Sequence, residues 1–399
     1  MKNSYDIVII GAGPAGLLAA GRAAMLGAKV VLLEKMEKPA RKLRITGKGR
    51  CNLTNMKPVD EYLKEISPEP RFLRQAFGRF FNQDIIDLLK ENGLDTKVER
   101  GQRVFPTSEK AWDVAEALIK WAKSNGAEIY NHTQVEELII EENQVKGVKV
   151  KNSESGSADT LSSKSVIIAT GGKSYSATGS TGDGYVFAEA SGHKIERLRP
   201  SLVGIETAPA FERLAGLELR NISLTVWIEG KKSKNEFGEV EFTVYGLDGP
   251  TILRLSRHII DSIIAGKKVE LSIDLKPALE LQKLDARLQR DLLEFEKKDF
   301  TYLLKQLIPI QLITTFIDIL KISPNKPVHQ INSNERKKLL NLLKDFRLTA
   351  TGFRGWDEAI ITAGGISIKD INPKTMESKI INNLYFAGEI IDVDGNTGG

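Results

Sequence analysis

The sequence is poor in residues that bind metals or form disulfides. Its 399 residues include one cysteine, Cys51, and four histidines that stand far apart. A single cysteine excludes an internal disulfide and also the paired redox cysteines of disulfide reductases. The isolated histidines have no metal-ligand spacing and belong to no triad motif, so we expect neither a metal site nor histidine-based catalysis.

Long apolar runs and a strong charge of one sign are also lacking. The most apolar stretches, residues 7–10 and 308–320, are too short or too interrupted to cross a bilayer, and no signal peptide precedes the first predicted strand. We therefore expect a cytoplasmic protein without a membrane partner. The net charge of +5 is spread along the chain without a run of five basic residues, so nucleic-acid binding is not indicated. The oligomeric state stays open.

The first part of the chain carries a dinucleotide-binding pattern. Residues 5–10 alternate loosely and end in an apolar run, which predicts a buried parallel strand. A Gly-x-Gly-x-x-Gly motif follows at residues 11–16, and the apolar segment 14–26 predicts a helix that Gly27 ends. Strand, glycine turn and helix in this order are typical of a Rossmann unit.

Each residue of the turn has a separate task in such a unit. Gly11 permits the tight turn, Gly13 lets backbone N–H groups approach a pyrophosphate, and Gly16 lets the helix pack close to the strand. The helix begins at Pro14 and Ala15, where unpaired N–H groups and the helix dipole favour a phosphate. The turn therefore predicts a binding site for a dinucleotide pyrophosphate.

A second predicted strand, residues 29–33, ends at Glu34. A carboxylate in that place accepts hydrogen bonds from the ribose of an adenosine. The pattern up to this residue fits NAD and FAD equally well, because both cofactors contain the same adenosine and pyrophosphate groups.

A basic, glycine-containing segment occupies residues 35–55. Arg41 and Lys42 can neutralise a pyrophosphate, and the turn at residues 46–49 can bring backbone close to a flat ring. This segment favours a flavin over a nicotinamide.

Three segments together resemble a known flavoprotein family. Residues 35–55, residues 166–185 with an Ala-Thr-Gly-Gly strand end, and residues 383–389, which end in Gly-Glu, are similar to the BaiN/RdsA-type family of NAD(P)/FAD-dependent oxidoreductases, also called YhiN-like or aminoacetone oxidase-like flavoproteins. The resemblance continues through nearly the whole chain. It implies an α/β fold of the FAD-binding Rossmann type and an oxidoreductase activity.

The resemblance also implies which residues hold FAD. Val135 would hold the adenine through its backbone, although a valine in an edge strand is an equally natural interpretation, and Glu389 would place its carboxylate on the ribitol. The full predicted set consists of Gly11, Gly13, Pro14, Ala15, Gly16, Glu34, Lys35, Arg41, Lys42, Thr46, Gly47, Gly49, Arg50, Cys51, Asn52, Val135, Ala169, Thr170, Gly171, Gly388, Glu389, Asp394 and Gly395.

The chain departs from the family pattern at two places. Family members often carry a histidine in the segment that is 242–250 here, whereas this chain has Val244, so a proton-transfer role for that histidine does not carry over. The family also continues beyond Thr397-Gly398-Gly399 into a further segment and a closing helix, which leads us to expect a truncated C-terminus.

The remaining patterns predict inserts within the nucleotide-binding domain. Short alternating strands at 135–168 predict a β-meander over the Rossmann sheet. Ligands of open α/β sheets lie beyond the strand C-termini, so a β-rich insert would form a wall of the substrate cleft. We expect a discontinuous FAD-binding domain at 1–195 and 346–399, an inserted β-rich substrate domain at 196–275 and 322–345, and a small helical insert at 276–321.

A bound flavin would carry the redox chemistry, so few catalytic side chains are required. We expect Arg50 to stabilise the anionic reduced ring, Tyr245 to donate a proton, and Cys51 to pack against the ring. No second Gly-x-Gly-x-x-Gly follows a predicted strand, so NADH or NADPH would bind transiently at the flavin face.

Three functions stay open on these grounds. The leading hypothesis is an NAD(P)H-dependent reductase that transfers hydride through flavin N5 to a small organic substrate, apolar or unsaturated. The first alternative is an amine or aminoketone oxidase that passes electrons to oxygen. The second alternative is a flavoprotein that binds RNA or a protein and acts as a modification factor.

Overall fold

The computed structural model describes residues 4–396, and the chain divides into two units. Unit 1 comprises residues 1–200 and 356–399, and unit 2 comprises residues 201–355. The chain thus leaves unit 1 once, builds unit 2 and returns. None of the helices among the described residues is long and apolar enough to cross a bilayer.

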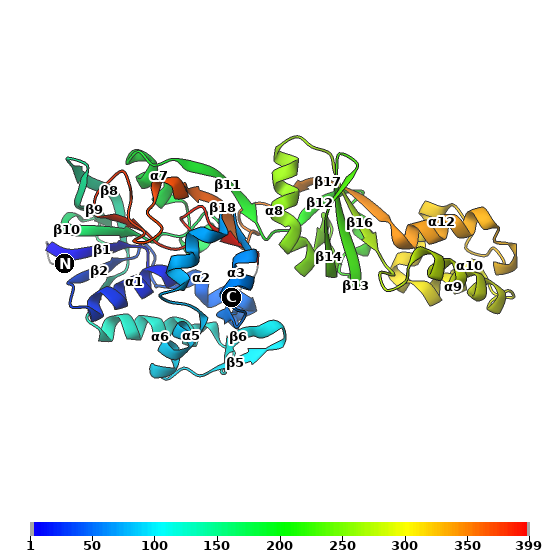
Figure 1. Ribbon diagram of the computed structural model, residues 1–399, viewed down its shortest axis with the longest axis horizontal. Helices are drawn as coiled ribbons and strands as arrows, with labels where there is room; N and C mark the ends of the chain where they lie inside the picture. The colour runs from blue at the N-terminus through cyan, green and yellow to red at the C-terminus, as the bar shows by residue number, and fades with distance from the viewer. Residues whose placement is uncertain (1–3, 397–399) are drawn as a thin grey trace. The chain divides into compact units, whose positions relative to one another are not determined.

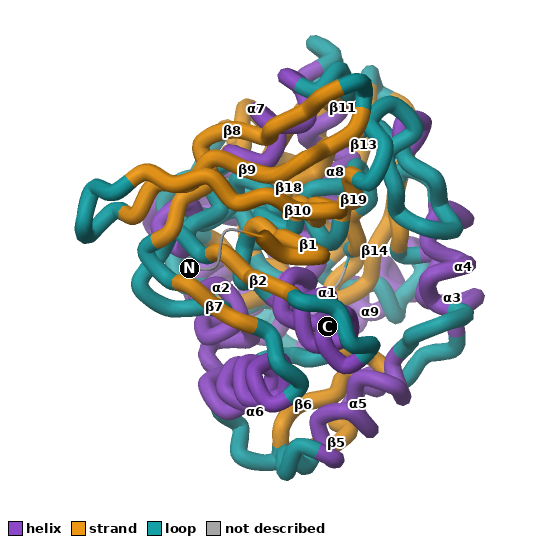
Figure 2. The backbone as a smooth tube through the Cα atoms, turned by 90° about the vertical axis from the view of Figure 1, so that its left-hand side faces the viewer, coloured by secondary structure: helices purple, strands orange, loops and turns teal. Residues whose placement is uncertain are grey.

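Unit 1 is built around a seven-stranded sheet with the order β7-β2-β1-β10-β9-β8, in which β19 also pairs with β10 (Figure 2). β1 pairs in parallel with β2 and β10, and β10 pairs in parallel with β19. Every residue of β2 is buried, as expected for a strand inside a parallel sheet. The strands are β1 (Ser4–Ile10), β2 (Val30–Leu33), β7 (Glu128–Tyr130), β8 (Thr133–Glu141), β9 (Gln144–Asn152), β10 (Ala158–Ile168) and β19 (Leu384–Phe386).

Strand β10 joins the parallel and antiparallel parts of this sheet. Its residues 158–162 pair antiparallel with β9, and its residues 162–168 pair in parallel with β1. The sequence predicted a meander lying over the sheet. The structure instead makes β8 and β9 a continuation of the sheet, because one uninterrupted strand belongs to both ladders.

Helices α1 and α6 pack against each other in unit 1 (Figure 1). Gly21 of α1 permits this contact, because a Cβ at that position would overlap the ring of Trp121 in α6. Buried apolar side chains of both helices share one core with Ile9 of β1 and Leu32 of β2. The helices of this unit are α1 (Pro14–Met25), α2 (Arg41–Ile45), α3 (Val59–Lys64), α4 (Arg74–Phe77), α5 (Asn82–Glu91), α6 (Ala111–Ser124) and α7 (Asp183–Ala190).

Three small sheets complete unit 1. β3 (Thr54–Asn55), β6 (Arg103–Pro106) and β5 (Thr96–Glu99) form one sheet. The strands β11 (Ile195–Ser201) and β18 (Ile361–Ile366) form the second, and β20 (Asp394–Gly395) with β4 (Ile66–Ser67) forms the third. The last two bring the C-terminal part of the chain back onto unit 1.

Unit 2 contains a closed barrel with the strand order β12-β15-β14-β13-β16-β17. Residues 222, 224 and 226 of β13 are buried and fill the interior, as the alternation of a half-buried strand requires. The strands are β12 (Ile205–Ala208), β13 (Glu218–Ile228), β14 (Lys231–Phe242), β15 (Gly246–Asp248), β16 (Val269–Asp274) and β17 (Phe346–Phe353).

Five helices accompany the barrel within unit 2. α8 packs on strand β14, and α12 lies next to α9 and α11. The helical insert predicted at 276–321 corresponds to α9, α10 and α11. The bounds are α8 (Pro250–Ile264), α9 (Leu281–Glu294), α10 (Phe300–Leu307), α11 (Ile313–Leu320) and α12 (Ser333–Lys344).

One predicted boundary is wrong. The sequence assigned residues 346–399 to the FAD-binding domain, but residues 346–355 belong to unit 2. The reason is that β17 pairs with both β12 and β16 and thereby closes the barrel. The amphipathic pattern of β17 fits a strand of either domain, so its pairing partners decide to which domain residues 346–355 belong.

The aromatic core around β17 gives a test of this assignment. Phe346 is fully buried against Phe211, Phe242 and Phe316, with ring centroids 5.5, 6.1 and 5.9 Å away. Phe346→Ala should therefore lower the free energy of unfolding by about 3–5 kcal/mol in urea denaturation. The control Phe237→Ala removes an exposed ring from the same barrel and should change it by less than about 0.5 kcal/mol. Equal effects of the two substitutions would contradict the barrel core described above.

Candidate functional site

The glycine turn between β1 and α1 has the shape of a phosphate cradle. Gly11 has φ +97°, and a Cβ on it would lie 2.7 Å from the Ala169 carbonyl oxygen. A Cβ on Gly16 would overlap the Gly11 carbonyl oxygen. By contrast, no described atom beyond its chain neighbours lies within 4 Å of a Cβ built on Gly13, so the space over this residue is open at the N-terminus of α1.

Glu34, directly after β2, is fixed beside this turn. Its Oε2 accepts a hydrogen bond from Ala12 N at 2.9 Å, and its Oε1 accepts one from Met36 N at 2.9 Å. Burial raises the pKa of the Glu34 carboxyl, and these two backbone hydrogen bonds act in the opposite direction. The carboxylate is thus oriented before any ligand arrives, as a ribose ligand requires.

A backbone hydrogen bond connects Glu34 to the start of the strand that contains Val135. Thr133 N donates to the Glu34 carbonyl oxygen at 2.8 Å, which ties the start of β8 to the end of β2. The ladder between β8 and β9 then shifts its register between Val135 and Glu137. This position suits the predicted contact of the Val135 backbone with adenine, which stays a prediction.

The loop from Thr46 to Cys51 has an unusual backbone. Gly47, Lys48, Gly49 and Cys51 all have positive φ, between 57° and 85°. Lys48 and Cys51 have side chains that disfavour this region, and such strain collects at ligand sites. Thr46 holds the start of the loop by donating from Oγ1 to the Leu43 carbonyl oxygen at 2.7 Å.

Cys51 and Asn52 follow on this loop. The Cys51 side chain is buried, and desolvation raises the pKa of its thiol, so it is a packing residue rather than a thiolate nucleophile. A Cβ on Gly47 would lie 2.9 Å from Asn52 N, which explains why glycine occurs there.

Two cations of the predicted cofactor site, Arg41 and Lys35, already have protein partners. Arg41 forms an ion pair with Glu37 and donates to the Ala177 carbonyl oxygen at 3.2 Å. Lys35 forms an ion pair with Asp183 at 2.6 Å. We therefore expect the backbone N–H groups at the N-terminus of α1, rather than these side chains, to bind the pyrophosphate.

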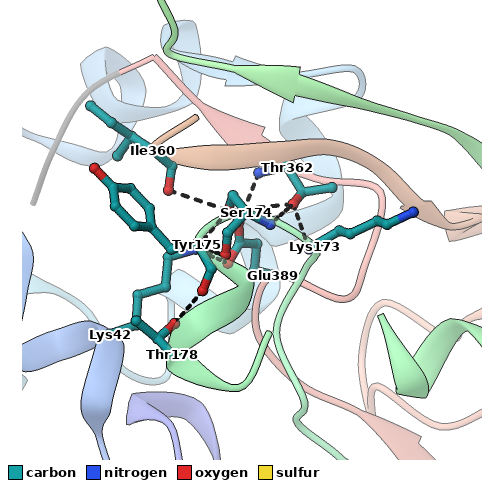
Figure 3. Close-up of polar contacts among 8 residues, drawn as sticks. All are labelled: Lys42, Lys173, Ser174, Tyr175, Thr178, Ile360, Thr362 and Glu389. Carbon is teal, nitrogen blue, oxygen red and sulfur yellow. Dashed lines mark hydrogen bonds and ion pairs between the residues drawn. The ribbon is translucent and has the colours of Figure 1, made fainter. Parts of the chain in front are cut away.

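Lys42 belongs to a polar cluster that connects distant segments (Figure 3). Its Nζ lies 2.7 Å from Ser174 Oγ and 3.2 Å from Glu389 Oε2. Glu389 Oε1 accepts from Thr362 N at 2.8 Å and from Ser174 Oγ at 3.3 Å. Thr362 Oγ1 in turn accepts from Lys173 N at 2.7 Å and Ser174 N at 3.2 Å. We call Lys42, Ser174, Thr362 and Glu389 the latch.

The predicted set of cofactor ligands includes neither Ser174 nor Thr362, although the resemblance to the family led us to expect residues 362–365 to line the flavin. Both side chains are buried, at 0% and 1% exposure, so their hydroxyl groups are committed to the latch. Both residues lie in segments that match the family and contain the Gly-Gly pairs 171–172 and 364–365. The latch fixes the orientation of the Glu389 carboxylate, which was predicted to contact the ribitol.

The end of β10 and the segment after β19 return to the glycine turn. Ala169 N donates to the Ile10 carbonyl oxygen at 2.8 Å, and Thr170 and Gly171 follow it, the latter with φ +73°. Gly388 has φ +82°, and a Cβ on it would lie 2.8 Å from the Cβ of Ala15 in α1. Segments from the middle and from the C-terminal part of the sequence thus meet at the N-terminus of α1.

Arg50 is held by acidic side chains of the β5–β6 region. Its Nη2 lies 2.5 Å from Glu99 Oε1 and 3.3 Å from Glu109 Oε1, and its guanidinium stacks 4.3 Å from the Phe105 ring centroid. The hydrogen bond to Glu99 raises the pKa of the Arg50 guanidinium, so the group stays charged. The two carboxylates reduce the charge that it can direct at a flavin.

Asp394 and Gly395 form β20, which pairs with β4, and Asp394 is buried. The predicted contact of these residues with FAD stays a prediction. The expected truncation concerns Thr397–Gly399, which lie outside the described residues.

Tyr245 lies in unit 2, immediately before β15. Its hydroxyl group donates to Asp248 Oδ2 at 3.1 Å, and the Arg354 guanidinium lies 4.5 Å from its ring centroid. The neighbouring Val244, which replaces the family histidine, is exposed. Tyr245 therefore contacts a carboxylate and a guanidinium, and its neighbour in the sequence is a valine instead of a histidine.

The family model described as "HI0933-like protein Rossmann domain" matches residues 5–399. The chain belongs to the HI0933-like family. The predicted family, FAD-binding Rossmann fold class and flavin-dependent oxidoreductase activity are thereby confirmed.

Several curated relatives align with this HI0933-like protein over nearly the full chain. A 3-dehydro-bile acid delta(4,6)-reductase of Clostridium scindens is 29% identical over 396 residues, which cover 98% of this chain and 94% of the relative. A ribosomal RNA dihydrouridine synthase of Haemophilus influenzae is 30% identical over 401 residues, covering 100% and 95%. The Escherichia coli enzyme of that name is 27% identical, covering 99% and 94%.

The geometry of the HI0933-like chain fits the cofactor of its family. The open space over Gly13 is where a side chain would compete with a pyrophosphate, and Glu34 is oriented at the end of β2. The latch brings Glu389 and Lys42 together on the same unit. These residues would hold FAD along its length.

Two alanine substitutions separate cofactor binding from folding. Gly13→Ala should leave the thermal midpoint of the apoprotein unchanged within about 2 °C, because its Cβ meets open space, but lower FAD affinity at least about tenfold. Gly16→Ala should lower both the thermal midpoint and the FAD affinity, because its Cβ would overlap the Gly11 carbonyl oxygen. Flavin absorbance after desalting and thermal unfolding measure the two effects. A Gly13→Ala protein with full FAD content would refute the cradle.

Proposed function

We propose that this flavoprotein uses NADH or NADPH to reduce a carbon–carbon double bond conjugated to a carbonyl group in an organic substrate. The observation that carries the proposal is the cradle over Gly13, which suits a hydride-transferring dinucleotide cofactor. The names of two relatives support the substrate class, since one reduces delta(4,6) bonds of a 3-dehydro-bile acid and the other forms dihydrouridine. Both substrates contain a double bond conjugated to a carbonyl group.

The residues of unit 1 would bind and orient the cofactor. The N-terminus of α1 would hold the pyrophosphate, Glu34 the ribose, and Glu389 the ribitol with Lys42 beside it. When bound, FAD supplies hydride transfer through its N5 atom. Arg50, oriented by Glu99, would offset negative charge on the reduced ring.

The reaction requires one hydride and one proton. The nicotinamide loses a hydride, the substrate carbon remote from the carbonyl gains it, and the carbon adjacent to the carbonyl gains a proton. We propose Tyr245 as the proton donor. The hydrogen bond to Asp248 and the Arg354 guanidinium over the ring hold its hydroxyl in one orientation.

Anaerobic reduction of the bound flavin tests the proposed function. NADH or NADPH should bleach the flavin, and addition of cyclohexenone or uridine should restore the oxidised spectrum, because the double bond accepts the hydride. Anaerobic buffer without acceptor is the control. Bleaching by a primary amine, with peroxide formed in air and no response to either nicotinamide, would contradict the proposal and identify an amine oxidase.

Tyr245→Phe separates the two half-reactions. The substitution keeps the ring under Arg354 but removes the hydroxyl group, so the rate of substrate reduction should fall on the order of 100-fold. The rate of flavin reduction by NADPH should not change. Stopped-flow absorbance measures both rates, and Tyr302→Phe in α10 is the matched control. An unaltered rate of substrate reduction would exclude Tyr245 as the donor.

A further inference from the structure

The strands β5 and β6 carry charged side chains on one face of their ladder. Lys97 pairs with Phe105, and Glu99 pairs with Arg103, in the antiparallel register. Residues directly opposite each other share a face of the ladder, and so do residues two apart on one strand. The ladder therefore presents the side chains of a lysine, a glutamate, an arginine and a phenylalanine on the same side.

Arg50, on the loop from Thr46 to Cys51, lies against this face. Its guanidinium lies over the Phe105 ring, 4.3 Å from the centroid, and its Nη2 lies 2.5 Å from Glu99 Oε1. The chain that follows the loop joins the same small sheet, because Leu53 N donates to the Val104 carbonyl oxygen at 2.8 Å. Arg50 is thus attached to β5 and β6 by its side chain and by its backbone.

A second carboxylate and a second cation complete the cluster. Glu109 Oε1 lies 3.3 Å from Arg50 Nη2 and also accepts a hydrogen bond from Lys97 Nζ. Lys97 Nζ lies 3.5 Å from Glu99 Oε1. Each carboxylate therefore contacts both cations, and each cation contacts both carboxylates. We call Arg50, Lys97, Glu99 and Glu109 the charge network.

All four groups of the charge network stay ionised near neutral pH. The hydrogen bond from Arg50 lowers the pKa of Glu99, and the hydrogen bond from Lys97 lowers the pKa of Glu109. The same two hydrogen bonds raise the pKa of the arginine and of the lysine. Two positive and two negative charges therefore offset each other, so the field that Arg50 directs at its surroundings depends on its three partners.

We propose that the charge network sets how strongly this protein favours the negatively charged, reduced form of FAD. The proposal rests on the proposed function in one respect, the position of Arg50 beside the reduced ring. Glu99 positions the guanidinium, Glu109 offsets part of its charge, and Lys97 offsets Glu109 in turn. Catalysis requires such a balance, because the flavin has to accept a hydride from one partner and release it to another.

An equilibrium with a reference dye measures this balance in the holoenzyme without nicotinamide or substrate. Xanthine and xanthine oxidase reduce dye and flavin slowly in the absence of oxygen, and absorbance gives the ratio of reduced to oxidised flavin at a fixed dye ratio. Glu109→Gln should raise this ratio about threefold, because it removes a negative charge and keeps the side-chain shape. Lys97→Gln should lower it about threefold, and Arg50→Gln should lower it at least as much.

Salt and charge changes elsewhere on the chain are the controls. The side chains of the charge network are between 26% and 47% exposed, so salt at about 1 M should reduce the effects. Glu91→Gln and Lys90→Gln alter exposed residues of α5 and should each change the ratio by less than about 1.5-fold. The proposal is overturned if Glu109→Gln and Lys97→Gln shift the ratio in the same direction, if neither exceeds its control, or if Arg50→Gln leaves the ratio unchanged.

Hydrogen exchange in the apoprotein tests the positioning role of Glu99 separately. Arg50 N donates to the Gly47 carbonyl oxygen at 3.2 Å. Cys51 N donates to the Thr46 carbonyl oxygen at 3.0 Å, so both amides are protected while the loop keeps this conformation. Glu99→Ala should speed their exchange about tenfold, whereas Glu99→Gln keeps an acceptor oxygen and should leave it within about twofold. Equal exchange rates in the two variants would show that Glu99 does not position the loop.

These measurements separate the charge network from the proposed function. Flavin reduction by NADPH is recorded in parallel for the unmodified protein. If NADPH does not reduce the flavin, the proposed function is wrong, but the dye equilibrium and the exchange rates still decide whether the charge network acts on the flavin and holds the loop.

Discussion

The close approach of three backbone segments at the start of α1 is the constraint on which unit 1 depends. Gly11 lies against the Ala169 carbonyl, Gly16 against the Gly11 carbonyl, and Gly388 against Ala15. Any side chain at these glycines would separate β1, α1, β10 and the segment after β19. The same packing leaves the space over Gly13 open at the N-terminus of α1, which is where we expect the pyrophosphate.

The charges around this cradle are largely compensated within the protein. Arg41, Lys42 and Arg50 each pair with a carboxylate, and Glu34 accepts two backbone hydrogen bonds. Partly buried ions need such partners, because an uncompensated charge is costly to desolvate. We therefore expect the cofactor site to rely on oriented backbone dipoles and on positioned side chains more than on free cations.

The sequence signals for the candidate cofactor site are local. The glycine turn, Glu34 and the loop from 46 to 51 lie in one continuous stretch whose backbone requirements follow from neighbouring residues. The roles of Ser174 and Thr362 in orienting Glu389 were not predicted, because serine and threonine are common and only burial beside Glu389 identifies these two. The same limit explains the misplaced boundary at residue 346, since pairing of β17 depends on two strands remote in sequence.

The sequence by itself determined the cofactor class, the family and the order of the main elements, because periodicity and turn chemistry act over a few residues. Only the tertiary structure decided which strands close the barrel and how the latch orients Glu389. These features arise where the chain brings distant residues within hydrogen-bonding or electrostatic range. Net charge and motif spacing describe the order of residues along the chain, so they do not predict which distant residues come into contact.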